Sequence, residues 1–121
     1  MAIKKTLVLG ASENPARYSN LAVKKLTANG HPVIAVGKRT GSINNTVIET
    51  EKKDFTDIDT VTLYLNPQNQ KEYYDYILSL RPKRIIFNPG TENDELVDLA
   101  NEKGIKTQEA CTLVLLSTTQ Y

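Results

Sequence analysis

The first residues that could do chemistry lie in a turn between an apolar run and a helix. Thr6–Leu9 is an unbroken β-favouring run, and Gly10 follows it directly. Because Gly10 has no Cβ, its backbone can approach a phosphate closely, and the N-terminus of the next helix offers unpaired N–H groups and the positive end of its dipole. Ser12 can donate a hydroxyl hydrogen bond, and Arg17 adds a permanent cation. This pattern predicts a phosphate-binding turn.

The turn is a variant of the dinucleotide fingerprint G-x-G-x-x-G. Ser12 stands where the second glycine is expected and Pro15 where the third is expected. Pro15 fixes φ at a turn or at the first helical position. A plain connection between strand and helix, with Asn14 or Ser19 as the N-cap, is the alternative interpretation.

A second chemical signal follows the next apolar run, Val33–Val36. The loop after it contains Gly37, Lys38 and Arg39. NAD-binding folds usually place an Asp or Glu here to accept hydrogen bonds from the ribose hydroxyls, whereas a phosphorylated ribose requires cations. Lys38 and Arg39 therefore predict contact with a phosphorylated ribose. A solvated basic loop is the alternative.

Length, charge and cysteine content narrow the class of protein. The 121 residues form one domain, 1–121, and the net charge of +1 argues against nucleic acid or a membrane as the main partner. One cysteine, Cys111, excludes an internal disulfide and a multi-cysteine metal site. Neither a secretion signal nor a run long enough to span a bilayer is visible, so we expect a cytoplasmic protein.

A catalytic set is not evident in the sequence. Glu92, Asp94 and Glu95 fall in the first turn of an expected helix, where the helix dipole explains them. Cys111 is expected to be a small buried or half-buried thiol, because the single histidine, His31, lies far away in the sequence in a turn expected to face solvent. We therefore expect a binding protein and not an enzyme.

The elements that position these residues follow from hydrophobic periodicity. Apolar runs predict strands over residues 6–9, 33–36, 61–65 and 84–87, with an edge strand over 105–108, and helices over about 19–29, 67–80 and 91–104. The alternation predicts an α/β fold: one Rossmann-like, three-layer domain with a mostly parallel sheet of about five strands.

Three segments leave alternatives open. Ile43 and residues 47–48 fit either a short strand or a turn. Tyr73, Ile77 and Leu80 form the inward stripe of the helix expected over 67–80. Tyr74 and Tyr76 lie off this stripe, which fits partial burial or a subunit interface. The apolar run 111–116 packs on the sheet or forms a self-association surface, so a homodimer or another protein partner stays open.

The four strand ends assemble into one edge, where ligands bind in open α/β sheets. With the runs G-A-S-x-N-P-x-R at 10–17 and N-P-G-T-E-N at 88–93, the chain resembles the small stand-alone CoA-binding proteins. These are Rossmann-like domains similar to the N-terminal nucleotide domain of the succinyl-CoA synthetase α subunit. The resemblance runs from Lys5 to about Cys111.

The resemblance implies a set of cofactor-binding residues. Gly10, Ala11, Ser12 and Arg17 would meet the pyrophosphate; Lys38 and Arg39 would lie near the phosphorylated ribose; Leu65, Asn66 and Pro67 would flank the adenine; Asn88, Pro89 and Gly90 would lie along the ligand's path. Asn14 and Pro15, in the first motif, and Gly37, in the basic loop, complete the set. The family often has Asn-Pro where this chain has Gly37 and Lys38, and the phosphorylated-histidine machinery of the synthetase has no counterpart here.

Three functions follow as hypotheses. The leading one is binding of CoA or acyl-CoA, a small-molecule nucleotide, without intrinsic catalysis, as a sensor or carrier. The second is an NADP-binding domain of a reductase, which shares the cationic second loop but usually keeps the fingerprint glycines. The third is a protein-interaction module with a degenerate site.

Overall fold

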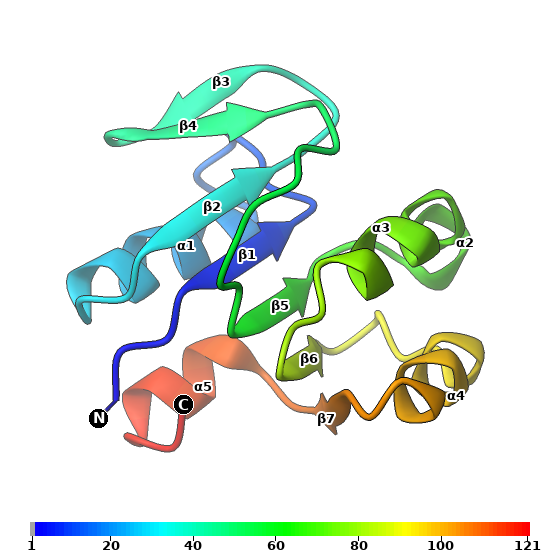
Figure 1. Ribbon diagram of the computed structural model, residues 1–121. Helices are drawn as coiled ribbons and strands as arrows, with labels where there is room; N and C mark the ends of the chain where they lie inside the picture. Colours follow the sequence, from blue (N-terminus) through cyan, green and yellow to red (C-terminus); the bar gives the residue numbers. More distant parts are fainter. Residues whose placement is uncertain (1) are drawn as a thin grey trace.

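A seven-stranded sheet forms the centre of the protein. The computed structural model describes residues 2–121 (Figure 1). The strand order is β3-β4-β2-β1-β5-β6-β7, and every neighbouring pair is parallel except β3 with β4. The strands are β1 Thr6–Leu9, β2 Val33–Val36, β3 Gly41–Ile43, β4 Thr46–Glu49, β5 Thr60–Leu63, β6 Arg84–Phe87 and β7 Lys106–Glu109. The predicted α/β class with a mostly parallel sheet is confirmed, with seven strands in place of about five.

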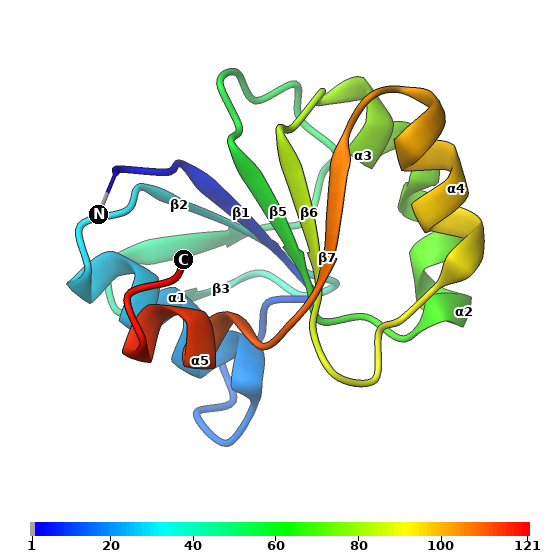
Figure 2. The ribbon, with the colours of Figure 1, turned by 90° about the horizontal axis from the view of Figure 1, so that it is seen from below.

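Helices cover both faces of the sheet. They are α1 Tyr18–Ala28, α2 Pro67–Gln70, the 3-10 helix η1 Lys71–Tyr73, α3 Tyr74–Ser79, α4 Asp94–Glu102 and α5 Thr112–Ser117. Figure 2 shows α1 and α5 on one face of the sheet and α2, α3 and α4 on the other. The three-layer architecture expected from the alternating pattern is therefore present.

Each face of the sheet has its own hydrophobic core. Leu7 and Leu9 point into the cluster under α3 and α4, whereas Val8 points into the cluster under α1 and α5. Successive strand residues point to opposite faces, so a strand covered on both sides must be apolar throughout. This explains why the central strands read as unbroken apolar runs in the sequence.

The two unpredicted strands form a hairpin, β3–β4, at one edge. Only Ile43 and Ile48 of this hairpin are buried, each 2% exposed, so its apolar signal is weak. Asn44 takes a φ of 53° where the hairpin turns, a left-handed conformation that Asn tolerates well. The segment around Ile43 and residues 47–48, expected to be a short strand or a turn, thus contains two short strands joined by a turn.

The helix expected over 67–80 is interrupted. The 3-10 helix η1 separates α2 from α3, and the buried Gln70 just before it donates hydrogen bonds from Nε2 to the carbonyl oxygens of Leu65 and Thr91, both at 2.8 Å. Tyr73 and Ile77 are buried as the periodicity predicts. The direction of the stripe was therefore correct and the continuity of the helix was not.

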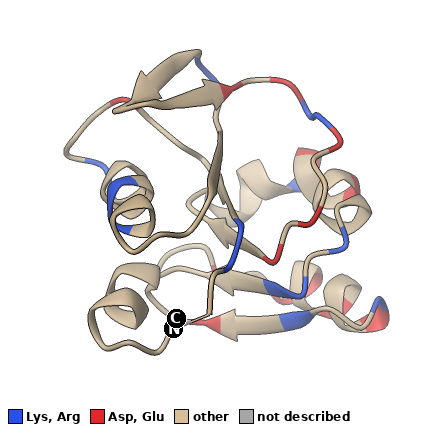
Figure 3. Cartoon of the chain, turned by 60° about the vertical axis from the view of Figure 1, so that its left-hand side comes forward, with Lys and Arg blue, Asp and Glu red and all other residues tan. Residues whose placement is uncertain are grey.

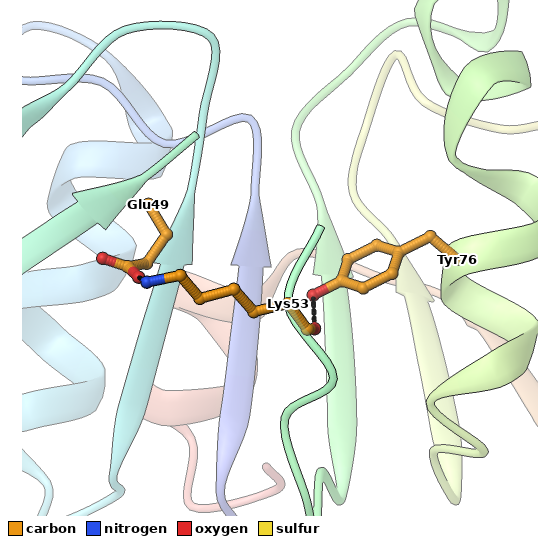
Figure 4. A network of polar contacts seen from close by, with 3 residues as sticks. All are labelled: Glu49, Lys53 and Tyr76. Atoms are coloured by element: carbon orange, nitrogen blue, oxygen red, sulfur yellow. Dashed lines mark hydrogen bonds and ion pairs between the residues drawn. The ribbon is translucent and has the colours of Figure 1, made fainter. Parts of the chain in front are cut away.

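Tyr76 is more buried than a position off that stripe suggests. Its ring covers the segment that leads from β4 to β5, and its hydroxyl donates to the Lys53 carbonyl oxygen at 2.6 Å (Figure 4). Burial raises the pKa of Tyr76 to about 12. Lys53 itself forms an ion pair with Glu49 of β4. Tyr76 thus fixes this segment, and with 8% exposure its side chain is buried beyond the partial burial expected.

Helix α4 begins three residues later than expected. Asn93 is its N-cap, and Asn93 Oδ1 accepts hydrogen bonds from the N–H groups of Glu95 and Leu96. Thr91, where the sequence pattern starts this helix with a possible capping residue, is buried and donates from Oγ1 to the Asn88 carbonyl oxygen at 2.8 Å. A second capping residue two positions further along competed with Thr91, and it caps the helix.

The run 111–116 packs on the sheet. All of it except Cys111 lies in α5, where Leu115 and Leu116 are buried in the cluster beside α1, while Val114 is exposed. At the start of α5, Thr112 Oγ1 and Thr62 Oγ1 of β5 share a 2.8 Å hydrogen bond. None of the helices formed by residues 2–121 has the length and apolar character needed to cross a bilayer.

His31 does not face solvent, contrary to the sequence-based expectation. It is 2% exposed, its Nδ1 accepts a hydrogen bond from the Lys4 N–H at 3.0 Å, and its ring centroid lies 5.0 Å from that of Tyr121. Burial, followed by the nearby charges of Lys4 and Arg84, lowers the pKa of His31, while Asp59 opposes this shift. The cause of the error is long-range: Tyr121 covers a turn that locally reads as a loop.

This environment makes stability depend on pH in a defined direction. Because the pKa of His31 is below its ordinary value of 6.5 in the folded state, the unfolded chain binds the proton more readily. Stability from neutral His31 is complete above pH 6.5 and is lost as the pH falls through that value. We expect His31→Asn, which keeps an acceptor for Lys4, to flatten the free energy of unfolding between about pH 7.5 and 5.5 in urea titrations. Equal slopes for the two proteins would contradict this.

Candidate functional site

A groove of about 810 Å³ lies at the carboxyl ends of four central strands. Loops after parallel strands meet at one edge of a sheet, and here the loops after β1, β2, β5 and β6 do so. The groove is lined by residues 10–14, 17–19, 37–40, 64–66, 69, 73 and 89–91. All predicted site residues line it except Pro15, Pro67 and Asn88.

The first two loops are tied together by one carbonyl group. The N–H groups of Gly10 and Ala11 both donate to the Val36 oxygen, at 2.8 and 2.9 Å. A Cβ on Gly37 would lie 2.3 Å from the Ala11 oxygen, so only glycine fits there. Gly10 has a φ of 96°, which favours glycine as well. These two N–H groups are therefore engaged within the protein, although both residues line the groove.

Side chains hold the rest of the first loop. Ser12 Oγ accepts from the Asn14 N–H at 3.1 Å, and Asn14 Oδ1 accepts from the Ala16 N–H at 3.0 Å. Asn20 of α1 donates from Nδ2 to the Ser12 carbonyl oxygen at 2.9 Å. Since Ser12 Oγ accepts one hydrogen bond, its hydroxyl hydrogen can still be donated to a ligand. The loop is preorganised before any ligand arrives.

Several donors in this loop are not engaged by the protein. Within residues 2–121, the N–H groups of Ser12 and Glu13 donate no hydrogen bond. Tyr18 and Ser19 line the groove at the start of α1, where the first N–H groups of a helix have no partner inside it. The buried Asn20 Oδ1 also finds no donor in the described part of the chain. The groove is therefore lined beside the first loop by residues with unpaired N–H groups, while the buried Asn20 Oδ1 lies outside that lining.

Three cations lie along the same side. Arg17, Lys38 and Arg39 are exposed and line the groove. Across residues 2–121 the one ion pair found is Lys53 with Glu49, so none of the three is neutralised by a carboxylate within 4.0 Å. Basic and acidic residues are otherwise spread over most elements (Figure 3). The positive charge of the groove is thus local, in keeping with a net charge of +1.

The opposite side is formed by the loop after β5 and the helices that follow. Asn66 Oδ1 accepts from the Asn69 N–H at 2.9 Å and caps α2. Pro67 is the first residue of α2 and fixes its start. Leu65 and Tyr73 add apolar surface, and Lys52 Nζ lies 5.0 Å from the Tyr73 ring centroid. This wall is less charged than the first.

Asn88 joins three elements and does not line the groove. It is 2% exposed, and its Nδ2 donates to Thr62 Oγ1 at 2.6 Å and to the Leu63 oxygen at 2.9 Å. Its Oδ1 accepts from the Thr112 N–H at 2.9 Å. Every polar atom of this side chain is therefore engaged by β5 or α5. Pro89 and Gly90, the next two residues, do line the groove.

Sequence reasoning missed some lining residues. Glu13, Tyr18, Thr40 and Tyr64 line the groove, and each stands next to a predicted site residue. Burial raises the pKa of Tyr64, whose hydroxyl has no hydrogen-bond partner in the described chain. The position of these residues next to the predicted motifs was the available signal, but it does not indicate which side chains line the groove. Glu13 reaches away from its own loop to β3, as described below.

The groove offers little for metal chemistry. Residues 2–121 contain no group of three His, Cys, Asp or Glu side chains that could hold a metal ion. Cys111, a free thiol of intermediate exposure, does not line the groove. The arrangement suits binding of an anion by backbone and side-chain donors.

Fold and site together define a Rossmann-like domain with a ligand groove at the carboxyl edge of its sheet. Residues 4–117 match the family described as CoA binding domain, and this chain belongs to that family. A comparison with curated proteins finds no match.

Several solved structures share this fold. The chain is 50% identical to an uncharacterized protein of known crystal structure, with a TM-score of 0.98 and complete coverage of both chains. It is 25% identical to a hypothetical protein from Pyrococcus horikoshii OT3, with a TM-score of 0.86 over 96% of this chain and 83% of that one. A protein from Thermus thermophilus at 20% identity shares the fold, with a TM-score of 0.85 over 98% of this chain and 91% of that one.

The role of Asn88 can be tested against that of a ligand contact. We expect Asn88→Ala to lower the free energy of unfolding by about 2–4 kcal/mol, because buried groups of β5 and α5 lose their partners. Asn66→Ala, which removes an exposed cap, should cost about 1 kcal/mol. Chemical denaturation of both variants measures this. An Asn88→Ala protein as stable as the wild type would contradict the structural role.

Proposed function

We propose that this protein binds CoA or an acyl-CoA in the groove and catalyses no reaction on it. The observation that carries the proposal is the meeting of three unneutralised cations with free backbone donors at one sheet edge. Membership of the CoA-binding family gives the ligand class.

The pyrophosphate is assigned to the first loop. The residues that carry the free N–H groups, Ser12 and Glu13, line the groove together with the start of α1, and the Ser12 hydroxyl can add a donor. Arg17 stands at the N-cap position of α1 and can add a bidentate hydrogen bond. Donors at a helix N-terminus favour a phosphate group without further help from the side chains.

The phosphorylated ribose is assigned to the second loop. Lys38 and Arg39 are free of ion pairs with the described carboxylates and are held beside the first loop by the contact between Gly37 and Ala11. Leu65 and Tyr73 supply apolar surface for the adenine on the other wall. Gly90 leaves space for an extended chain, since a Cβ there would meet nothing within 4 Å.

The side chains in the groove favour binding over catalysis. Glu13 is the one carboxylate among its lining residues, and no histidine or cysteine is found in that lining. Burial raises the pKa of Tyr64 further above its ordinary value of 10, which makes its phenolate still less available as a base. A sensor or carrier of CoA needs only affinity, which this set of groups can provide.

Isothermal titration with CoA and dephospho-CoA tests the proposal. A charge pair to the ribose phosphate is worth about 1.5–3 kcal/mol, so we expect CoA to bind at least tenfold more tightly than dephospho-CoA. The double variant Lys38→Ala with Arg39→Ala should abolish most of that difference.

The matched control is Lys71→Ala with Lys103→Ala, two exposed lysines outside the groove. It removes the same charge and should leave both affinities unchanged. Absence of CoA binding, or equal affinity for both ligands in the wild type, would contradict the proposal. Tight binding of NADPH without binding of CoA would favour the reductase hypothesis instead.

A further inference from the structure

We propose that Glu13 determines specificity for the position of the ribose phosphate, accepting a free 2′-hydroxyl and rejecting a 2′-phosphate. The inference rests on the proposed function and adds to it a discrimination between two classes of phosphorylated adenosine. It is drawn from where the Glu13 carboxylate lies.

Glu13 belongs to the first loop but its carboxylate lies at the start of β3. Glu13 Oε2 accepts a hydrogen bond from the Ser42 N–H at 2.9 Å. The side chain also occupies the space next to Gly41, where a Cβ would lie 2.2 Å from Glu13 Cδ. Both contacts place the carboxylate at the far end of the loop that follows β2, where β3 begins.

A carboxylate near the loop that follows the second strand has a known chemical role in Rossmann-like folds. An acidic side chain at the end of the second strand accepts hydrogen bonds from the ribose hydroxyls of adenosine. The residues that follow β2 here are Gly37, Lys38 and Arg39, none of which is acidic. Glu13 brings a carboxylate to this place from the preceding loop, a position that the usual fingerprint does not predict.

The carboxylate keeps one oxygen available. Glu13 Oε1 makes no hydrogen bond within residues 2–121, and Glu13 lines the groove together with Lys38, Arg39 and Thr40. None of the described cations lies within 4.0 Å of it. Two cations from the second loop and one negatively charged hydrogen-bond acceptor from the first loop thus line the same part of the groove.

The two signs of charge suit one phosphate isomer. CoA carries a phosphate on the 3′ oxygen and a hydroxyl on the 2′ carbon, so Lys38 and Arg39 can hold the phosphate while the hydroxyl donates to Glu13 Oε1. A 2′-phosphate, as in NADP, would set two negative groups against each other, and like charges at short range repel.

Two isomeric probes isolate this effect. Adenosine 3′,5′-bisphosphate and adenosine 2′,5′-bisphosphate have the same charge and composition and differ only in the position of one phosphate. We expect the wild type to bind the 3′,5′ isomer about tenfold more tightly. Glu13→Gln keeps an oxygen for the Ser42 N–H and loses the charge. It should therefore reduce the ratio of the two affinities, mainly because it binds the 2′,5′ isomer more tightly than the wild type does.

The matched control is Glu92→Gln. Glu92 Oε1 also accepts from a backbone N–H, that of Gly90 at 2.8 Å, but Glu92 does not line the groove. This variant should keep the wild-type ratio of affinities for the two isomers. Thermal midpoints of both variants, measured in parallel, report whether the fold is retained.

The outcomes separate the two proposals. If CoA binds but the wild type shows no preference between the isomers, or Glu13→Gln leaves the ratio unchanged, the role of Glu13 is wrong and the proposed function stands. If neither CoA nor either isomer binds, the proposed function itself fails.

Discussion

The structure depends on one carbonyl group, that of Val36 at the end of β2. It accepts hydrogen bonds from the N–H groups of both Gly10 and Ala11, and this brings the loops after β1 and β2 into direct contact. Glycine at position 37 follows from that contact, because any side chain would collide with Ala11. The same arrangement leaves the next N–H groups, those of Ser12 and Glu13, available to an anion. Close packing of two loops thus determines which backbone donors the groove offers.

The constraint also explains why charge gathers in the groove on a nearly neutral protein. Arg17 comes from the first loop and Lys38 and Arg39 from the second, so the cations come together only because the loops do. Each would be an ordinary solvated side chain on an isolated loop. Glu13 adds a second link, from the first loop to β3, through the Ser42 N–H. The backbone contact between the two loops therefore determines where the positive charge of the groove lies.

The sequence predicts the parts of this fold that periodicity encodes. The four central strands are buried on both faces, and their unbroken apolar runs identify them almost to the residue. The β3–β4 hairpin escaped prediction because only Ile43 and Ile48 face the core. His31 was assigned to solvent because its cover, Tyr121, is distant in sequence. The rule that ligands bind at the carboxyl ends of parallel strands located the groove. The contact of Glu13 with Ser42 and the hydrogen bonds that bury Asn88 join elements far apart in the sequence, so no local pattern predicts them.

In the proposed complex the N–H groups after Ala11, and not those of Gly10 and Ala11, receive the ligand's phosphates. Amide chemical shifts in a two-dimensional ¹⁵N–¹H NMR titration with CoA test it most directly. We expect the largest changes at Ser12 and Glu13 and in the loop 37–40, while the amides of Gly10 and Ala11 stay protected from hydrogen exchange with and without CoA. Shifts confined to the opposite edge of the sheet, around Lys5 and Lys83, would contradict the account.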